Sequence, residues 1–219
     1  MNIVRSLVVI TLSVIILVAC KSKEKPATPS TFCQPDCGMD TIRVNDENKN
    51  KAFVSITMQN CEADSITWGN RKMATYRQLL FAELVGKYVK LNKDYVRIHL
   101  FDDHAWLQFN ECDKGQGYIV KLPFNKTENI SRKNSAFNPM YTNYKVDEGM
   151  VAYTDRGNIF VEDMATGKKA MMTFGVQTDM EYDNMPATVE SVEITPTHIK
   201  AKVLIEKEWK DIEKDITLE

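Results

Sequence analysis

The chain has 219 residues, of which 28 are Lys or Arg and 30 are Asp or Glu, so its formal net charge is −2. This balance excludes the basic surface on which nucleic-acid-binding domains depend, and we expect no nucleic-acid partner. The length is sufficient for one domain with a substantial core.

The first twenty residues have the pattern of a secretory signal. Arg5 supplies a positive charge, an apolar run extends from Leu7 to Ala19, and Cys20 follows directly. This run of 13 residues is too short to cross a hydrocarbon core of ~30 Å, which needs about 20. The segment Leu17-Val18-Ala19-Cys20 resembles the lipobox of bacterial lipoproteins. In that family the cysteine receives the lipid and becomes the first residue of the mature protein.

This resemblance implies an order of segments along the chain. Residues 1–19 are the expected signal peptide, residues 20–31 a lipidated flexible tether, and residues 32–219 a single mainly β domain. The tether contains Pro26 and Pro29 and no large apolar side chain, a composition typical of disorder. Because Lys21 follows the cysteine, the proteobacterial sorting pattern favours the outer membrane. We therefore expect a lipid-anchored protein of the cell envelope.

Four further cysteines suit an exported protein, in which disulfides persist. They are Cys33, Cys37, Cys61 and Cys112. Three pairings are possible, and we favour Cys33–Cys37 with Cys61–Cys112. The first bridge closes a tight loop, and the second connects two β segments. A zinc site formed by the four thiolates is an alternative, although the Cys-x-x-x-Cys spacing has no matching second pair.

From residue 40 onward the sequence predicts mainly strands, because apolar and polar residues alternate. The predicted strands in the first half cover residues 52–58, 88–91, 95–101, 106–109 and 118–122. The interval Met73–Val85 differs, since its apolar residues recur at helical spacing and Gly86 follows as a plausible stop. It predicts a helix over 73–85, with another buried strand as the alternative.

The second half continues as a meander. Strands are predicted over 150–155, 158–163, 170–174, 187–195 and 198–206, with an edge strand or short helix over 206–219. Residues 135–174 resemble one blade of a TolB-type or WD40-like β-propeller, because an Asp-x-Gly-Asn turn is followed by a Thr-Gly-Lys turn. No second copy of this signature appears, whereas a closed propeller needs at least four blades. The expected fold is therefore an antiparallel meander, as an open sheet or a sandwich of propeller-blade-like units, with one helix.

One cluster of side chains has metal-ligating chemistry. His99, Asp102, Asp103 and His104 lie around a single predicted hairpin turn. The alternative is that the loop is simply polar and solvated. No catalytic residue and no cofactor are predicted.

Two other sets of residues are candidates for carbohydrate chemistry. Trp68, Trp106 and Trp209 could form a platform on which a sugar stacks, although such residues usually belong to the core. Thr41 and Ser65 follow aspartates and precede isoleucines, which resembles the O-glycosylation sites of exported Bacteroidetes proteins.

From these observations we expect a non-enzymatic envelope lipoprotein that binds or scaffolds another component. It would meet the membrane through its N-terminal lipid and an envelope protein or glycan through its domain. The alternative is a hydrolase of envelope glycans or peptides, possibly metal-dependent, or a glycan-binding lipoprotein.

Overall fold

The computed structural model describes residues 41–46, 50–73, 76–175, 178 and 180–219, and these residues form four β-sheets. Sheet A contains β1 (Ile42–Asn45), β2 (Phe53–Gln59), β3 (Glu62–Gly69) and β4 (Arg77–Leu80). Sheet B contains β5 (Val96–Leu100), β6 (His104–Asn110), β7 (Gly117–Pro123) and β8 (Ser131–Lys133). Both are antiparallel meanders in chain order.

The second half forms the other two sheets. Sheet C contains β10 (Met150–Asp155), β11 (Asn158–Asp163) and β12 (Lys169–Met172). Sheet D has the order β15 (Glu208–Asp215), β14 (His198–Ile205), β13 (Val189–Ile194) and β9 (Tyr144–Val146). The β9–β13 pair is parallel, and the other pairs are antiparallel. Two 3-10 turns, Lys93–Tyr95 and Met185–Ala187, precede β5 and β13.

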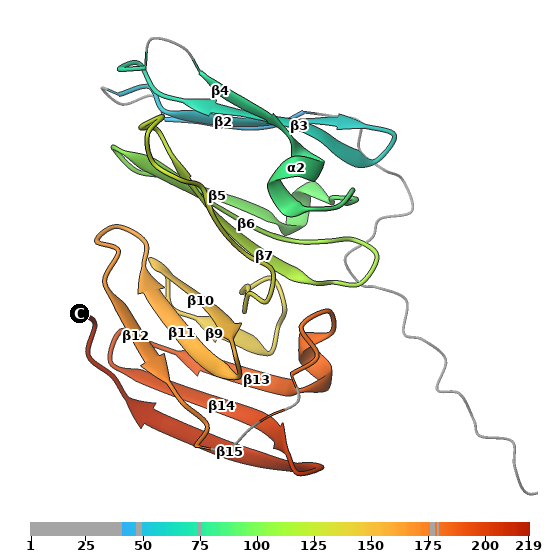
Figure 1. Cartoon of the computed structure of the whole chain (residues 1–219), viewed down its shortest axis with the longest axis vertical. Helices are drawn as coiled ribbons and strands as arrows, with labels where there is room; N and C mark the ends of the chain where they lie inside the picture. Colours follow the sequence, from blue (N-terminus) through green and yellow to red (C-terminus); the bar gives the residue numbers. More distant parts are fainter. Residues whose placement is uncertain (1–40, 47–49, 74–75, 176–177, 179) are drawn as a thin grey trace, which may run out of the picture.

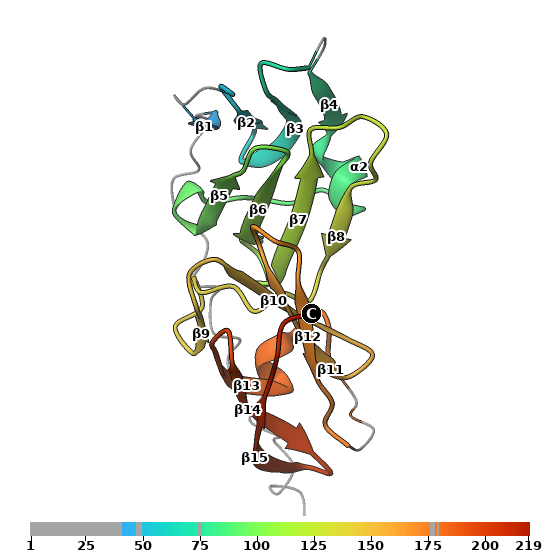
Figure 2. The same ribbon diagram turned by 90° about the vertical axis from the view of Figure 1, so that its left-hand side faces the viewer.

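The four sheets stack face to face in chain order, which gives the molecule its elongated shape (Figures 1 and 2). One apolar cluster joins sheets A and B, and it contains Ile66, Trp68, Leu107 and Val120. A smaller cluster, with Trp106 and Tyr153, joins sheets B and C, and a third joins sheets C and D. Sheets B and C are therefore covered on both faces, whereas sheets A and D each have one face free of other described elements.

The strand pattern explains this arrangement. In β6 every residue is buried, with Leu107 and Phe109 facing sheet A and Trp106 facing sheet C. In β1, at the end of the stack, burial alternates between half-buried and exposed residues. A strand covered on both faces needs an apolar or paired side chain at every position, whereas an end strand needs one only at alternate positions.

Tight two-residue turns connect several hairpins. The turns between β2 and β3, between β10 and β11, and between β14 and β15 each place two consecutive residues at positive φ. This is the type I′ conformation, which matches the twist of paired strands. Only the middle turn has a glycine, Gly157.

The predicted helix is largely wrong. Residues 77–80 form β4, which pairs with Ser65–Trp68 of β3, and the helix α2 covers only Phe81–Val85. Two residues of the expected apolar stripe are exposed, Tyr76 by 62% and Leu80 by 53%. Pairing with a buried strand thus overrides the helical spacing. The predicted stop is confirmed, because Gly86 adopts the left-handed conformation.

The predicted fold class, mainly β with open sheets and one helix, is confirmed. The predicted strand at 88–91 is reduced to a single bridge between Lys90 and Glu62. The last segment forms the edge strand β15. In the blade-like region, residue 136 bridges Tyr153 at the free edge of β10, which adds a short fourth segment to sheet C. The resemblance of 135–174 to a propeller blade stays a prediction.

Candidate ligand-binding site

The outer face of sheet D carries mainly charged side chains of alternating sign, together with Leu204 and the exposed Trp209, which face each other at one end. One row across the four strands reads Lys145, Glu193, Lys200, Glu213. In the adjoining rows, Lys202 forms an ion pair of 2.5 Å with Glu190, and His198 contacts Asp215 at 2.8 Å. Opposite charges on neighbouring strands attract one another, and a face with this composition is stable in contact with water.

The outer face of sheet A has a different composition. The corresponding row across its strands reads Arg43, Ser55, Thr67 and Gln78. A second row joins Asn45, Phe53 and Gly69, with the ring of Tyr76 lying over Gly69. Hydroxyls, amides, two aromatic rings and one cation thus replace the paired charges of sheet D.

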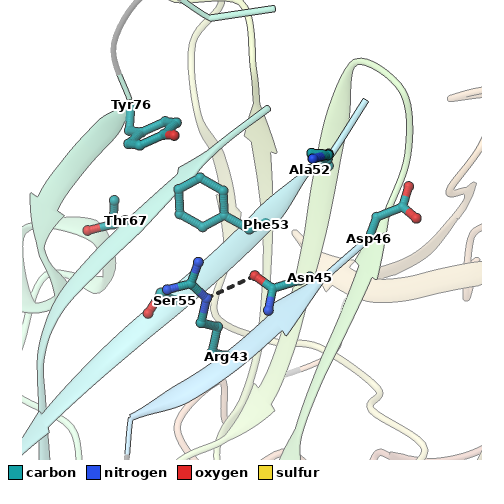
Figure 3. A pocket seen from close by; sticks show the side chains of 9 residues that line it. Arg43, Asn45, Asp46, Ala52, Phe53, Ser55, Thr67 and Tyr76 are labelled. Carbon is teal, nitrogen blue, oxygen red and sulfur yellow. Dashed lines mark hydrogen bonds between the residues drawn. The ribbon is translucent and has the colours of Figure 1, made fainter. Parts of the chain in front are cut away.

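These residues line a pocket of about 730 Å³ on the outer face of sheet A (Figure 3). The lining comes from β1, β2 and β3 and from two adjoining loops. It comprises Arg43, Asn45, Asp46, Lys51, Ala52, Phe53, Ser55, Thr67 and Tyr76. The volume is within the range typical of small-molecule sites, about 300–1,000 Å³.

The aromatic part of the pocket is held in place by packing. The rings of Phe53 and Tyr76 meet edge to face with centroids 4.8 Å apart. Phe53 is nearly buried, whereas Tyr76 is 62% exposed. A Cβ atom at Gly69 would lie 2.8 Å from Cδ1 of Tyr76, so the missing side chain makes room for this ring. The pocket therefore presents an exposed tyrosine ring supported from below.

Arg43 is oriented by two contacts. Its Nε donates a hydrogen bond to Oδ1 of Asn45 at 2.8 Å, and its guanidinium lies 5.3 Å from the centroid of Phe53. Among the described residues, its two Nη groups have no hydrogen-bond partner. Because the guanidinium is fixed at one side only, its Nη groups can bind an anion without first being released.

Two neighbouring pairs of hydroxyl groups differ in what they bind. Thr57 and Ser65 lie opposite each other on β2 and β3, and their hydroxyls are hydrogen-bonded at 2.7 Å. Ser55 and Thr67 are the next facing pair, at the pocket floor, and their side chains make no hydrogen bond within the described part of the chain. The two hydroxyls at the pocket floor are thus free of hydrogen bonds to the described residues, whereas the two hydroxyls of the neighbouring row are bonded to each other.

The predicted metal site does not form. His104 is buried, and its Nδ1 lies 2.5 Å from Oδ1 of Asp103 while its Nε2 lies 2.8 Å from the carbonyl oxygen of Met164. Oδ1 of Asp102 instead accepts a hydrogen bond from Asn50 at 2.6 Å. No group of three or more metal-ligating side chains occurs in the described residues.

His99 belongs to a separate environment. It pairs with Trp106 across the β5–β6 hairpin, so its partner on β6 is two residues beyond His104. Burial and the nearby charge of Arg97 lower the pKa of His99. The two histidines thus have separate roles, and that of His104 is to link sheet B to the turn after β11.

The predicted tryptophan platform is also wrong. Trp68 and Trp106 are buried, and their Nε1 atoms donate to the carbonyl oxygens of Pro123 and Met164, both at 3.0 Å. Of the three tryptophans only Trp209 is substantially exposed. Tyr76, which the sequence had suggested for a helix, is the exposed aromatic side chain in the lining of the pocket on sheet A.

The backbone around Cys61 and Cys112 disagrees with a bridge between them. Leu91 donates to the carbonyl of Cys61, while Cys112 donates to the carbonyl of Lys90. The two cysteines therefore flank the same segment on opposite edges, and two strand spacings separate them by ~9.5 Å. Cα atoms in a disulfide lie within about 7 Å. The favoured Cys61–Cys112 pairing thus does not fit the fold, and the pairings with Cys33 and Cys37, which lie outside the described residues, stay predictions.

The remaining predicted sites are tested only in part. Cys20, the predicted lipidation site, lies outside the described residues, in which no helix is long and apolar enough to cross a membrane. Thr41 is exposed, but Ser65 is only 8% exposed and hydrogen-bonded to Thr57. The geometry thus favours Thr41 over Ser65 for O-glycosylation, which stays a prediction.

Comparison of the sequence with family models and with curated proteins gives no match. The assignment of a site therefore depends on the geometry of this chain. Sequence reasoning missed the pocket because its residues come from separated strands and loops. The available signal was the polar, uncharged side chains at alternate positions of 53–57, next to apolar neighbours.

Proposed function

We propose that this protein is a lipid-anchored envelope protein that acts as a non-enzymatic binding module, with its binding surface on the outer face of sheet A. The observation that carries the proposal is the contrast between the two ends of the stack. Sheet D ends in rows of alternating charge, whereas sheet A ends in a pocket whose Ser55 and Thr67 side chains make no hydrogen bond among the described residues.

The physical reason is the free-energy cost of desolvating each face when a partner covers it. A partner that covers sheet D must desolvate many charged groups, some of which already form ion pairs. A partner that covers sheet A gains hydrogen bonds from Ser55 and Thr67 and buries the exposed ring of Tyr76. Such a mixture of an aromatic anchor and a few polar groups is typical of binding sites.

The position of the expected anchor agrees with this proposal. In the sequence, the predicted tether precedes β1, the edge strand of sheet A. The expected lipid would therefore be joined to the end of the domain that begins with the proposed binding sheet. Attachment to a membrane raises the effective concentration of the module near envelope components. Even a weak site can then be occupied.

The test is site-specific photocrosslinking of the full-length, lipidated protein in intact envelopes. Gln78→p-benzoylphenylalanine places the probe on β4 beside Thr67, without altering a pocket residue. Lys200→p-benzoylphenylalanine is the matched control in the central row of sheet D. We expect adducts from position 78, lost in a Cys20→Ser background, and few from position 200. Equal labelling from both faces, or labelling from position 200 alone, would contradict the proposal.

A further inference from the structure

We infer that the pocket on sheet A binds an acidic saccharide, that is, a sugar ring bearing a carboxylate. This inference rests on the proposed function and adds the chemical class of the ligand. It combines three features of one pocket: an exposed aromatic ring, a polar uncharged floor and a guanidinium fixed at one side.

The ring of Tyr76 provides the apolar contact. It is 62% exposed, and its edge-to-face packing on Phe53 holds its plane in place. A pyranose ring has one face formed mainly by C–H groups, which can pack flat against an aromatic face. Because the tyrosine ring has few rotatable bonds, little conformational entropy is lost when a ligand packs against it.

The floor provides hydrogen bonds of the kind that sugar hydroxyls form. Ser55 and Thr67 face each other across β2 and β3, and each hydroxyl can both donate and accept. Asn45 adds an amide at the edge, and its Oδ1 already holds Arg43. Figure 3 shows Ser55, Thr67 and Asn45 around the ring of Phe53.

Arg43 provides the acidic preference. Its guanidinium lies next to Ser55 in the same row, and its Nη groups remain available within the described part of the chain. Lys51 adds a second cation to the lining, against the one carboxylate of Asp46. The described lining therefore carries more positive than negative charge, in a chain of net charge −2. A planar guanidinium binds a carboxylate through two parallel hydrogen bonds.

No simpler ligand uses all three features. A free inorganic anion would use Arg43 but leave the Tyr76 ring exposed. A neutral sugar would use the ring and the hydroxyls but leave the guanidinium unpaired. A carboxylated sugar engages the aromatic ring, the floor and the cation together, and its size is compatible with a pocket of about 730 Å³.

The experiment is isothermal titration calorimetry on the full-length protein in detergent. The probes are tetramers of galacturonate, glucuronate and mannuronate, each compared with its carboxyl-reduced neutral counterpart. We expect at least one acidic tetramer to bind at least tenfold more tightly than its neutral form. This preference should weaken as NaCl is raised from 50 to 500 mM, because charged contacts are screened.

Four variants identify the residues responsible. Arg43→Gln should remove the preference for the acidic form, and Tyr76→Ala should weaken both forms at least tenfold. Tyr76→Phe keeps the ring and should bind both forms more tightly than Tyr76→Ala does. Lys200→Gln, on sheet D, removes a cation outside the pocket and should leave both affinities unchanged. Thermal unfolding of each variant checks that the fold is kept.

The inference is overturned if no acidic tetramer binds more tightly than its neutral form, or if folded Arg43→Gln keeps the acidic preference. Its failure is separable from failure of the proposed function. If adducts still form from position 78 and not from position 200, sheet A is a binding face whose ligand is not an acidic saccharide.

Discussion

Replacement of His104 by alanine should destabilise the fold by about 3 kcal/mol, because this side chain connects two sheets. The lost hydrogen bond to Met164 contributes about 1 kcal/mol. The bond to Asp103 contributes less than 1 kcal/mol, since the carboxylate is 85% exposed and screened by water. The imidazole is buried and stacked on Phe101 at 4.9 Å, and removal of a buried ring costs about 1–2 kcal/mol more.

The assay is urea unfolding of the full-length protein, followed by tryptophan fluorescence. For a domain of this size, about 3 kcal/mol corresponds to a decrease in melting temperature of roughly 6–12 °C. His99→Ala is the matched control, because His99 makes no hydrogen bond to another sheet within the described residues, and its effect should be clearly smaller. A loss below about 0.5 kcal/mol for His104→Ala would refute the reasoning.

The same contact predicts a dependence on acid. Partial burial raises the pKa of Asp103, but the hydrogen bond and charge of His104 outweigh burial and lower it overall. A carboxyl with a lowered pKa stabilises the fold above its unfolded pKa of about 3.9, and this contribution is lost as the pH falls through the lowered value. The wild type should therefore lose stability below about pH 4 more steeply than Asp103→Asn does. Parallel curves for the two proteins would contradict this.

Three further predictions concern a turn, a close backbone contact and the cysteines. Asp163→Ala should cost about 1 kcal/mol in urea unfolding, because its carboxylate accepts hydrogen bonds from three groups of the following turn, whereas Asp163→Asn should cost less. Gly117→Ala should cost about 2 kcal/mol or more, because its Cβ would collide with the carbonyl oxygen of Ala136, and an unchanged melting temperature would show that this contact can relax. Peptide mapping without reduction should find Cys61 and Cys112 each joined to a cysteine before residue 40, and a peptide joining Cys61 directly to Cys112 would exclude this pairing.

Much of the fold could be predicted because alternating apolar and polar residues indicate a strand with one buried face. The strands β2, β5, β6, β7, β10, β11, β13 and β14 agree with the predicted segments to within two residues at most ends. The prediction failed at 77–80, where Leu79 and Leu80 follow each other and no alternation is visible in the sequence. Pairing with β3 determines that segment, and the partner of a strand cannot be derived from local spacing.

The candidate site was less predictable, for a related reason. Its floor is a row across strands, and a row depends on register. A shift of β1 by one residue would turn Arg43 toward the core and Val44 toward the pocket. Sequence reasoning selected His99 and His104 because they are close along the chain, yet the residues that meet in the pocket are Arg43, Thr67 and Tyr76.

The architecture itself restricts where such a site can lie. In sheets B and C both faces pack against a neighbouring sheet. A substitution at Trp106 or Tyr153 therefore disturbs the apolar cluster between these sheets and not an exposed surface. The two end faces are free of this constraint. In sheet D the free face carries rows of alternating charge, and a ligand there must desolvate charged groups, some of which already form ion pairs. On sheet A the side chains of Ser55 and Thr67 make no hydrogen bond within the described residues, and the exposed tyrosine would pack against a ligand without loss of stability to the core. Substitutions at Ser55 and Thr67 should therefore alter binding far more than unfolding.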